Sequence, residues 1–245
     1  MKIIAVIPAR YKSTRFEGKP LADICGKPMI WWVYNQVKKV TGLKDVFVAI
    51  DDDRVANVCD KYDMKYIRTL NTHPDHIARV HEVATKIEAD YYICVNGDEP
   101  LIDPEAIRQI IPVEKYSGFY FCGAMRTFTD PVEVIDPGNI KLVISGEGKC
   151  IYMSRTPVPY PKGTLLFQYN KYIGIECFTI EALDFFVSTS MGAIERIEDI
   201  DHLRFLEGGK ELHFKYVNSE SISVDTKKDL EKVKILLVNN GCENG

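Results

Sequence analysis

Apolar residues in the first half of the chain follow two alternating patterns. Unbroken apolar runs predict strands at 2–8, 45–50, 65–68 and 91–95. Between them, apolar residues recur at helical spacing and predict helices over 28–40, 57–61 and 75–87 and from 104 onward. Aspartates that precede two of these helices are natural N-terminal caps, namely Asp52 or Asp53, and Asp103. The alternation favours βαβ units and a parallel sheet covered on both faces, which binds ligands beyond the carboxyl ends of its strands.

The second half is less regular. Short apolar runs separated by turn residues predict strands at 119–128, 140–145, 150–154 and 171–178. Helices are predicted over 195–207, where Gly208 and Gly209 stop the helix, and over 226–238. There is no internal repeat, low-complexity tract or evident linker. We therefore predict one α/β domain over 1–245, with a Rossmann-like, mostly parallel sheet and a smaller mixed or antiparallel extension.

Composition narrows the class of protein. The chain is 46% hydrophobic and 27% charged with a formal net charge of −4, which argues against a nucleic-acid binder. Its seven cysteines are scattered without a C-x-x-C pair, and they indicate free thiols in a reducing compartment. No secretory signal opens the chain and no apolar run approaches the ~20 residues that span a bilayer. We expect a cytoplasmic protein without membrane insertion.

The loop after the first predicted strand concentrates positive charge. Arg10, Lys12, Arg15 and Lys19 lie within ten residues, together with Gly18. Such a loop suits a triphosphate, because backbone N–H groups can wrap the phosphates while the cations neutralise them. The glycine spacing matches neither a Walker A loop nor a dinucleotide fingerprint. The alternative is a solvated basic loop.

The stretch "IPARYKSTRFEGKPLADICGKPMI" resembles the N-terminal signature of the CMP-Kdo synthetases, the cytidylyltransferases that activate 3-deoxy-manno-octulosonate (Kdo). The similarity continues, in the family's order, through "AIDDDRV", "NGDEPLI", "NIKLVI", "YMSRTPVP", "KYIGI", "DIDHLRFLEGG" and "SVDTKKDLEKV". It covers nearly the whole chain. It implies a nucleotidyltransferase fold, CTP and a small acidic sugar as substrates, pyrophosphate release, a role in surface polysaccharide synthesis and a homodimer. A nucleotide-binding half (1–115), an acceptor and dimerisation lobe (116–190) and a return to the core (191–245) would follow.

The resemblance assigns roles to individual residues. Those implied to bind the nucleotide are Pro8, Ala9, Arg10, Ser13, Arg15, Lys19, Asn96 and Gly97. Arg10, Lys19 and Asp98 would be catalytic, because stabilising charge on the phosphates is the main device of nucleotidyl transfer. Asp98 and Asp225 would hold Mg²⁺. Asp98 follows a predicted strand and Asp225 precedes a helix, so two oxygen ligands can meet at one sheet edge. The alternatives are a turn aspartate and an N-cap.

The acceptor positions depart from the family's pattern. Where the family typically reads H-x-S-G-T-[DE]-R, this chain reads "HPDHIAR", and its Asn96, Tyr172 and Glu176 replace a usual glutamine, histidine and tyrosine. The residues expected to line the acceptor side are Asp75, His76, Arg79, Arg155, Tyr172, Glu176 and Glu198, with Lys141 a further candidate. For Arg155, Glu198 and Lys141, surface salt bridges are an equal alternative.

These changes predict that Kdo is a poor acceptor. Asp75 and Glu176 add negative charge, and Ile77 would reduce the space for an eight-carbon sugar. An acceptor with an amine, such as amino-Kdo, or a compact phosphonate held by Arg79 would be favoured. A catalytically silent nucleotide-binding homologue is the alternative from another class, while an NAD-type dehydrogenase lacks its glycine fingerprint.

Three of the five histidines lie close together in the sequence, at His73, His76 and His81, beside Asp75 and Glu82. A zinc site is conceivable from these residue types. His76 and His81 are five residues apart, about 140° around a helix, so they do not share a face. We favour a role for His76 in binding the acceptor, protonated against an acidic group.

Overall fold

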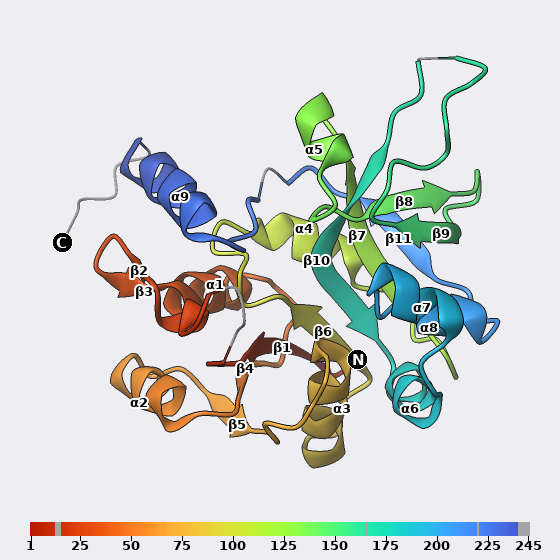
Figure 1. Ribbon diagram of the computed structural model, residues 1–245. Helices are drawn as coiled ribbons and strands as arrows, with labels where there is room; N and C mark the ends of the chain where they lie inside the picture. Colours follow the sequence, from red (N-terminus) through yellow and green to blue (C-terminus); the bar gives the residue numbers. More distant parts are fainter. Residues whose placement is uncertain (13–15, 165, 220, 240–245) are drawn as a thin grey trace.

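The first half of the chain folds into the predicted parallel sheet. A computed structural model describes residues 1–12, 16–164, 166–219 and 221–239. Within it, four parallel strands lie side by side in the order β6-β1-β4-β5 (Figure 1). Their bounds are β1 Ile3–Ala9, β4 Asp45–Ile50, β5 Tyr66–Arg68 and β6 Tyr91–Val95. All four predicted strands are confirmed.

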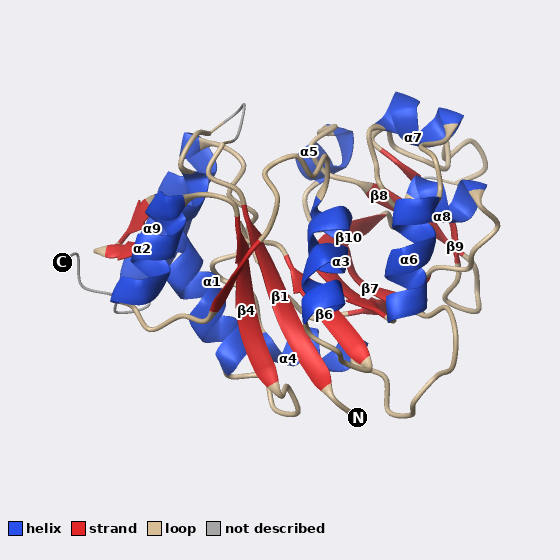
Figure 2. Ribbon diagram, turned by 90° about the horizontal axis from the view of Figure 1, so that it is seen from below, coloured by secondary structure: helices blue, strands red, loops and turns tan. Residues whose placement is uncertain are grey.

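Helices cover both faces of this sheet (Figure 2). One face packs against α1 (Met29–Lys38), α2 (Asp53–Lys61) and α4 (Pro104–Ile110). The other face packs against α3 (His76–Lys86), together with α6 (Ile180–Ser188), which the sequence analysis did not predict. The predicted caps are in place: Asp52 accepts from the N–H of Arg54, and Asp103 from that of Glu105. Asp75 caps α3 in the same way.

The second half extends the same sheet with antiparallel strands. Its elements are β7 (Phe121–Thr127), α5 (Pro131–Ile135), β8 (Lys141–Ile144), β9 (Cys150–Ser154), β10 (Asn170–Phe178) and β11 (His213–Tyr216). β10 lies antiparallel between β6 and β7, β11 runs parallel to β7, and β8 pairs with β9 and β10. Within the described residues these five strands and the four parallel strands of the first half make one nine-stranded sheet. The mixed extension is confirmed, whereas α5 and β11 were not predicted.

The predicted helix over 195–207 is wrong, because two short helices occupy that stretch. They are α7 (Ala193–Glu198) and α8 (Leu203–Glu207). Asp199 ends α7 in the left-handed conformation, with φ of 52°, and aspartate is one of the few side chains that visit this region. The turn that follows carries Asp201 and His202 toward the sheet.

The C-terminal segment returns to the loop that follows β1. After β1 come the short helix η1 (Lys19–Leu21) and the paired strands β2 (Asp23–Ile24) and β3 (Lys27–Pro28), and β2 packs against α9 (Lys227–Asn239). Ile24 and Met29 share a small apolar core with Val224 and Leu230. This packing brings Asp225, at the start of α9, next to the basic loop.

Two expectations on composition can be compared with the structure. The six described cysteines are free thiols, as predicted; Cys242 lies outside the described residues. In the part of the chain that the structure describes, the helices are too short or too polar to cross a membrane.

Candidate active site

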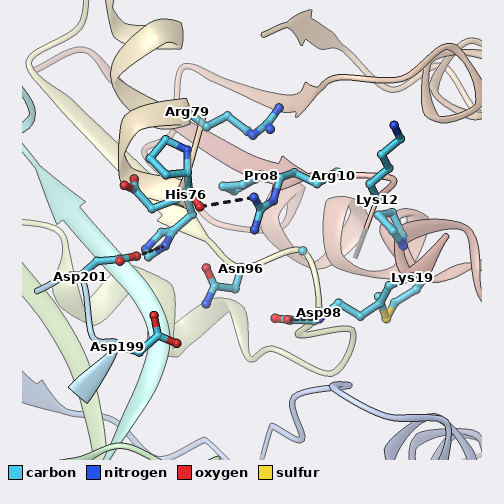
Figure 3. A pocket seen from close by; sticks show the side chains of 16 residues that line it. Pro8, Arg10, Lys12, Lys19, His76, Arg79, Asn96, Asp98, Asp199 and Asp201 are labelled. Atoms are coloured by element: carbon cyan, nitrogen blue, oxygen red, sulfur yellow. Dashed lines mark hydrogen bonds and ion pairs between the residues drawn. The ribbon is translucent and has the colours of Figure 1, made fainter. Parts of the chain in front are cut away.

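An open pocket lies where the order of the parallel strands reverses. From β1 the chain moves outward to β4 and β5 and then crosses back to place β6 on the other side of β1. In open α/β sheets, the carboxyl ends of two such strands border the ligand crevice. The pocket has a volume of about 400 Å³, within the range of ligand sites. Loops after β1 and β6, the start of α3 and the turn between α7 and α8 line it (Figure 3).

Gly97 lets the loop after β6 approach the end of β1. A Cβ at this position would lie 2.6 Å from the carbonyl oxygen of Pro8, closer than any real contact. The neighbouring Asn96 is placed by Gly174, where a Cβ would lie 2.5 Å from the Asn96 amide nitrogen. The predicted nucleotide-binding residues Pro8, Ala9, Asn96 and Gly97 all line the pocket.

Two carboxylates converge on the ammonium of Lys19. Its Nζ lies 2.6 Å from Asp98 Oδ2 and 3.5 Å from Asp225 Oδ1. The N–H of Val224 donates to the carbonyl of Asp98 at 2.8 Å, which ties the C-terminal segment to this loop. Asp98 Oδ1 is buried and accepts no hydrogen bond from any described residue. A buried carboxylate oxygen without a donor next to a second carboxylate suits a hard divalent cation, whose preferred ligands are oxygens.

The remaining described cations of the basic loop face the same pocket. Arg10 and Lys12 both line it. Arg10 is exposed, and its Nη1 lies 3.4 Å from the carbonyl oxygens of His73 and Pro74 (Figure 3). Its guanidinium is therefore within reach of a ligand in the pocket. Ser13 and Arg15 lie outside the described residues.

Arg79 is part of the pocket wall and has protein partners. The residue is fully buried, its Nη2 lies 2.9 Å from Asp51 Oδ2, and its Nη1 donates to Thr69. Asp51 also accepts from the backbone N–H of Tyr11 at 3.2 Å. Arg79 thus anchors α3 to β4 and to the basic loop, and its Nη groups are committed there. Because these groups already have protein partners, the structure does not favour the expectation that Arg79 binds a phosphonate.

The far end of the pocket is built around His76. His76 lies at the first position of α3 with a side chain 23% exposed, and its Nε2 lies 3.1 Å from Glu176 Oε2. Glu176 is fully buried on β10, where His202 Nε2 lies 2.5 Å from Oε1 and the hydroxyl of Tyr172 also donates to it. Asp201 Oδ2 lies 3.4 Å from His76 Nδ1 on the pocket side.

The contacts among His76, Glu176, Asp201 and His202 shift the pKa values of His76 and Glu176. Burial opposes protonation of His76, but the carboxylates of Glu176 and Asp201 outweigh it and raise the pKa of His76 well above its ordinary value. Burial likewise opposes ionisation of Glu176, yet His76 and His202 lower the pKa of Glu176 below its ordinary range. The carboxylate added by Glu176 is therefore offset by the histidines around it.

The steric expectation for this end is wrong, whereas Asp75 does line the pocket. Ile77 is fully buried in the core beneath α3 and does not line the pocket, so it takes no space from a ligand. Asp75 lines the pocket, but its carboxylate accepts the N–H of Ala78 at 2.7 Å as the helix cap. Burial, followed by the nearby Asp201, raises the pKa of Asp75.

Arg155, Glu198 and Lys141 are not brought to the pocket. Arg155 Nε and Nη2 donate to the carbonyls of Glu198 and Asp199, and Glu198 accepts from the N–H of Arg155. The pair supports the turn between α7 and α8. Lys141 is fully buried, and its Nζ donates to three backbone carbonyls, those of Asp136, Asn139 and Arg155. Both roles are structural.

The clustered histidines diverge, as the helical spacing predicted. His73 lies 2.5 Å from Glu82, whereas His81 lies 2.9 Å from Asp184. The histidine that does meet His76 is His202, which the sequence analysis missed along with Asp199 and Asp201. The signal was present in the quoted motif "DIDHLRFLEGG", to which no role was assigned.

A cation-lined crevice at a strand reversal, with two carboxylates beside it, defines a nucleotide-binding α/β protein. The family model described as Cytidylyltransferase matches residues 4–222. The chain therefore belongs to the cytidylyltransferase family, and it is a nucleotidyltransferase.

Known proteins from one branch of that family are similar to this chain over nearly its whole length. The 3-deoxy-manno-octulosonate cytidylyltransferase of Escherichia coli is 34% identical over 99% of both chains. The 8-amino-3,8-dideoxy-manno-octulosonate cytidylyltransferase of Shewanella piezotolerans is 34% identical over 94% of this chain and 96% of its own. A solved structure of CMP:2-keto-3-deoxy-manno-octonic acid synthetase complexed with CTP superimposes with a TM-score of 0.92 and 33% identity, covering 98% of this chain and 100% of that one. The resemblance to the CMP-Kdo synthetases, and with it the nucleotidyltransferase fold, is confirmed.

Proposed function

We propose that this enzyme transfers CMP from CTP to a hydroxyl of Kdo, or of a closely similar sugar acid, and releases pyrophosphate. In the reaction a bond forms between the acceptor oxygen and the α-phosphorus, the bond from the α-phosphorus to the bridging oxygen breaks, and the hydroxyl proton leaves to solvent. The observation that carries the proposal is the convergence of Lys19, Asp98 and Asp225 at the strand reversal.

The chain's own residues account for the electrostatics of this step. Arg10, Lys12 and Lys19 face the pocket and would bind the phosphates of CTP, with Lys19 beside the charge that develops on pyrophosphate. Asp98 and Asp225 would hold Mg²⁺. When bound, Mg²⁺ supplies Lewis-acid stabilisation of the phosphate oxygens. Ser13 and Arg15 remain proposed phosphate ligands from the sequence.

Kdo itself is the acceptor we now favour. The expectation that Kdo is a poor acceptor rested on Ile77, Asp75 and Glu176. Ile77 is in the core, Asp75 caps α3, and Glu176 is offset by two histidines. The steric ground for excluding an eight-carbon sugar acid is therefore gone, the charge of Glu176 is paired, and relatives over the whole chain act on Kdo or amino-Kdo by name.

A pyrophosphate-release assay tests the proposal. With CTP, Mg²⁺ and Kdo we expect turnover that excess chelator abolishes. Without a bound cation, the carboxylates of Asp98 and Asp225 would repel the triphosphate. CTP should be preferred over ATP. Silence across Kdo, amino-Kdo, other sugar acids and phosphonates would contradict the proposal and favour a nucleotide-binding homologue. Activity that survives chelator would contradict the metal role.

We also propose that the enzyme works as a cytoplasmic homodimer joined through the second half. The described residues between β9 and β10, 155–164 and 166–169, leave the body of the molecule (Figure 1). They expose large apolar side chains, with Tyr160 84% and Leu166 91% exposed, and Ile151 on β9 is 61% exposed. Apolar groups gathered on one segment are typical of an interaction surface.

Sedimentation velocity tests the dimer. The wild-type chain should sediment at twice the mass of one chain, whereas Leu166→Asp should shift it toward the monomer because it places a charge in an apolar interface. Val113→Asp, at an equally exposed valine of the first half, is the matched control. A monomeric wild-type protein would contradict the dimer.

A further inference from the structure

A buried carboxylate beneath the acceptor end of the pocket holds two imidazoles from distant parts of the chain. Glu176 of β10 contacts His76, 100 residues earlier, and His202, 26 residues later. His202 is buried, whereas His76 reaches the pocket.

The distances in the cluster indicate hydrogen bonds between these side chains, and they do not fit ligands of one metal ion. Two imidazoles and a carboxylate are a common set of metal ligands, and their ligand atoms lie within 4.8 Å of one another. However, His202 Nε2 and Glu176 Oε1 are 2.5 Å apart. Two ligands of one ion at bond lengths of about 2.1 Å lie about 3 Å or more apart, whereas charge-assisted hydrogen bonds are shorter. The cluster is therefore a hydrogen-bonded network.

The pocket-side edge of His76 is paired with Asp201, and a ligand hydroxyl can bridge this pair. Nε2 of His76 is engaged by Glu176 below, and Nδ1 lies on the pocket side, 3.4 Å from Asp201. Both His76 and Asp201 are partly exposed, at 23% and 29% of their side chains. In the pocket wall, His76 can donate a hydrogen bond and the neighbouring Asp201 can accept one. A hydroxyl is able to accept the first and donate the second.

We propose that His76 is an acceptor-specificity residue, that it binds a hydroxyl of the sugar acid together with Asp201, and that Glu176 and His202 are positioning residues beneath it. This inference rests on the proposed transfer to a sugar acid. A hydroxyl accepts from His76 Nδ1–H and donates to Asp201. An ammonium in its place would meet the imidazolium with like charge, and a phosphonate would meet the carboxylates of Asp199 and Asp201.

The charges around His76 support a protonated ring. The charged and titratable groups on the elements that surround it are Asp75 and Arg79 of α3, Tyr172 and Glu176 of β10, Cys94 of β6, Asp199, Asp201 and His202 of the turn, and Arg10 of the basic loop. Glu176 and Asp201 contact the ring directly and raise its pKa well above the ordinary value. Since a raised pKa means that the folded protein favours the protonated ring, the donor at Nδ1 persists through neutral pH and is lost only as the pH rises past that pKa.

The first test is His76→Gln, which keeps a polar side chain at this partly buried position and removes the charge. We expect KM for Kdo to rise about 10- to 100-fold, the usual value of a hydrogen bond to a charged group, while KM for CTP stays within about 2-fold. His81→Gln on the same helix, whose histidine contacts Asp184 outside the pocket, should leave both unchanged. With the 8-deoxy analogue of Kdo, the penalty of His76→Gln should shrink if the terminal hydroxyl is the partner. A constant penalty with Kdo and with each of its deoxy analogues would overturn the proposal.

The second test separates positioning from mere support. In Glu176→Gln the pKa of His76 should fall toward its ordinary value, so kcat/KM for Kdo should match the wild type at pH 6 and fall progressively above pH 7. A purely structural role for Glu176 predicts a loss that is independent of pH.

Nuclear magnetic resonance keeps the inference falsifiable without turnover. In the wild-type protein the ¹⁵N shifts of His76 should report a protonated ring above pH 7. A His76 that titrates near 6.5, or one equivalent of zinc retained through His202, would overturn the proposal even in an active enzyme. If CTP and Kdo release no pyrophosphate, the proposed function fails first, and the two failures are thereby distinguished. Preference of the wild type for 8-amino-Kdo over Kdo would overturn the hydroxyl assignment alone.

Discussion

Lys19→Ala should lower kcat by about 10²- to 10³-fold in a protein that still folds. Groups placed where charge develops in the transition state contribute losses of this size when they are removed. Lys19 meets that description because its Nζ lies between Asp98 and Asp225, at the mouth of the crevice that would hold the triphosphate. KM for the acceptor should change little, since Lys19 lies at the end of the pocket opposite His76 (Figure 3).

Steady-state kinetics and thermal unfolding together check this expectation. Lys44→Ala removes an exposed lysine that does not line the pocket, and it should leave kcat and the free energy of unfolding within the ±0.5 kcal/mol typical of surface changes. Wild-type turnover in a folded Lys19→Ala protein would remove the phosphate-binding interpretation of the basic loop.

Asp98→Asn should cost activity of the same order and should do so through the metal. Replacing the carboxylate by an amide removes the charge that would hold Mg²⁺, and Lewis-acid stabilisation of several kcal/mol corresponds to a loss of about 10²-fold or more. The remaining activity should require higher Mg²⁺, because Asp225 would still supply one ligand. Stability should not fall in parallel, since Asp98 Oδ1 is buried without a donor among the described residues.

A magnesium titration of the initial rate distinguishes a metal ligand from a structural aspartate. Asp53→Asn, at an aspartate 82% exposed that does not line the pocket, serves as the control. An Asp98→Asn enzyme with the wild-type requirement for Mg²⁺ would contradict the assignment of this residue. A large fall in melting temperature without a change in that requirement would show a structural role instead.

Local rules predicted the first half of the fold and little of the far end of the pocket. The parallel strands and their caps followed from apolar runs and from Asp52 and Asp103, because each of these signals acts within a few residues. α6 and β11 were missed, although both carry apolar residues that the core requires. The break at Asp199 depends on a left-handed residue that is not glycine, for which the sequence offers only a weak signal.

The same difference separates the two ends of the pocket, one of which was expected and one of which was not. Lys19, Asp98 and Asp225 were expected together because the family resemblance implied it, and for Lys19 and Asp98 the meeting of strand ends at one sheet edge supports the expectation. The histidine network was not expected, since Glu176 and His202 meet only after β10 and the turn following α7 have packed against each other beneath His76. Glu176 had therefore been interpreted as an unpaired charge, which reversed the inference about the acceptor.

The position of β10 in the sequence also determines how long the edge of β6 stays unpaired while the chain is being synthesised. β6 ends at Val95, but the strand that pairs with its free edge ends at Phe178, about 80 residues later. At ribosomal speeds this interval lasts on the order of ten seconds, during which the N–H and C=O groups along β6 remain available to other chains. A fragment that stops near residue 115 keeps that edge permanently. We therefore expect a fragment over 1–115 to aggregate more readily than the full chain, and a nascent chain to be most exposed to aggregation before β10 emerges.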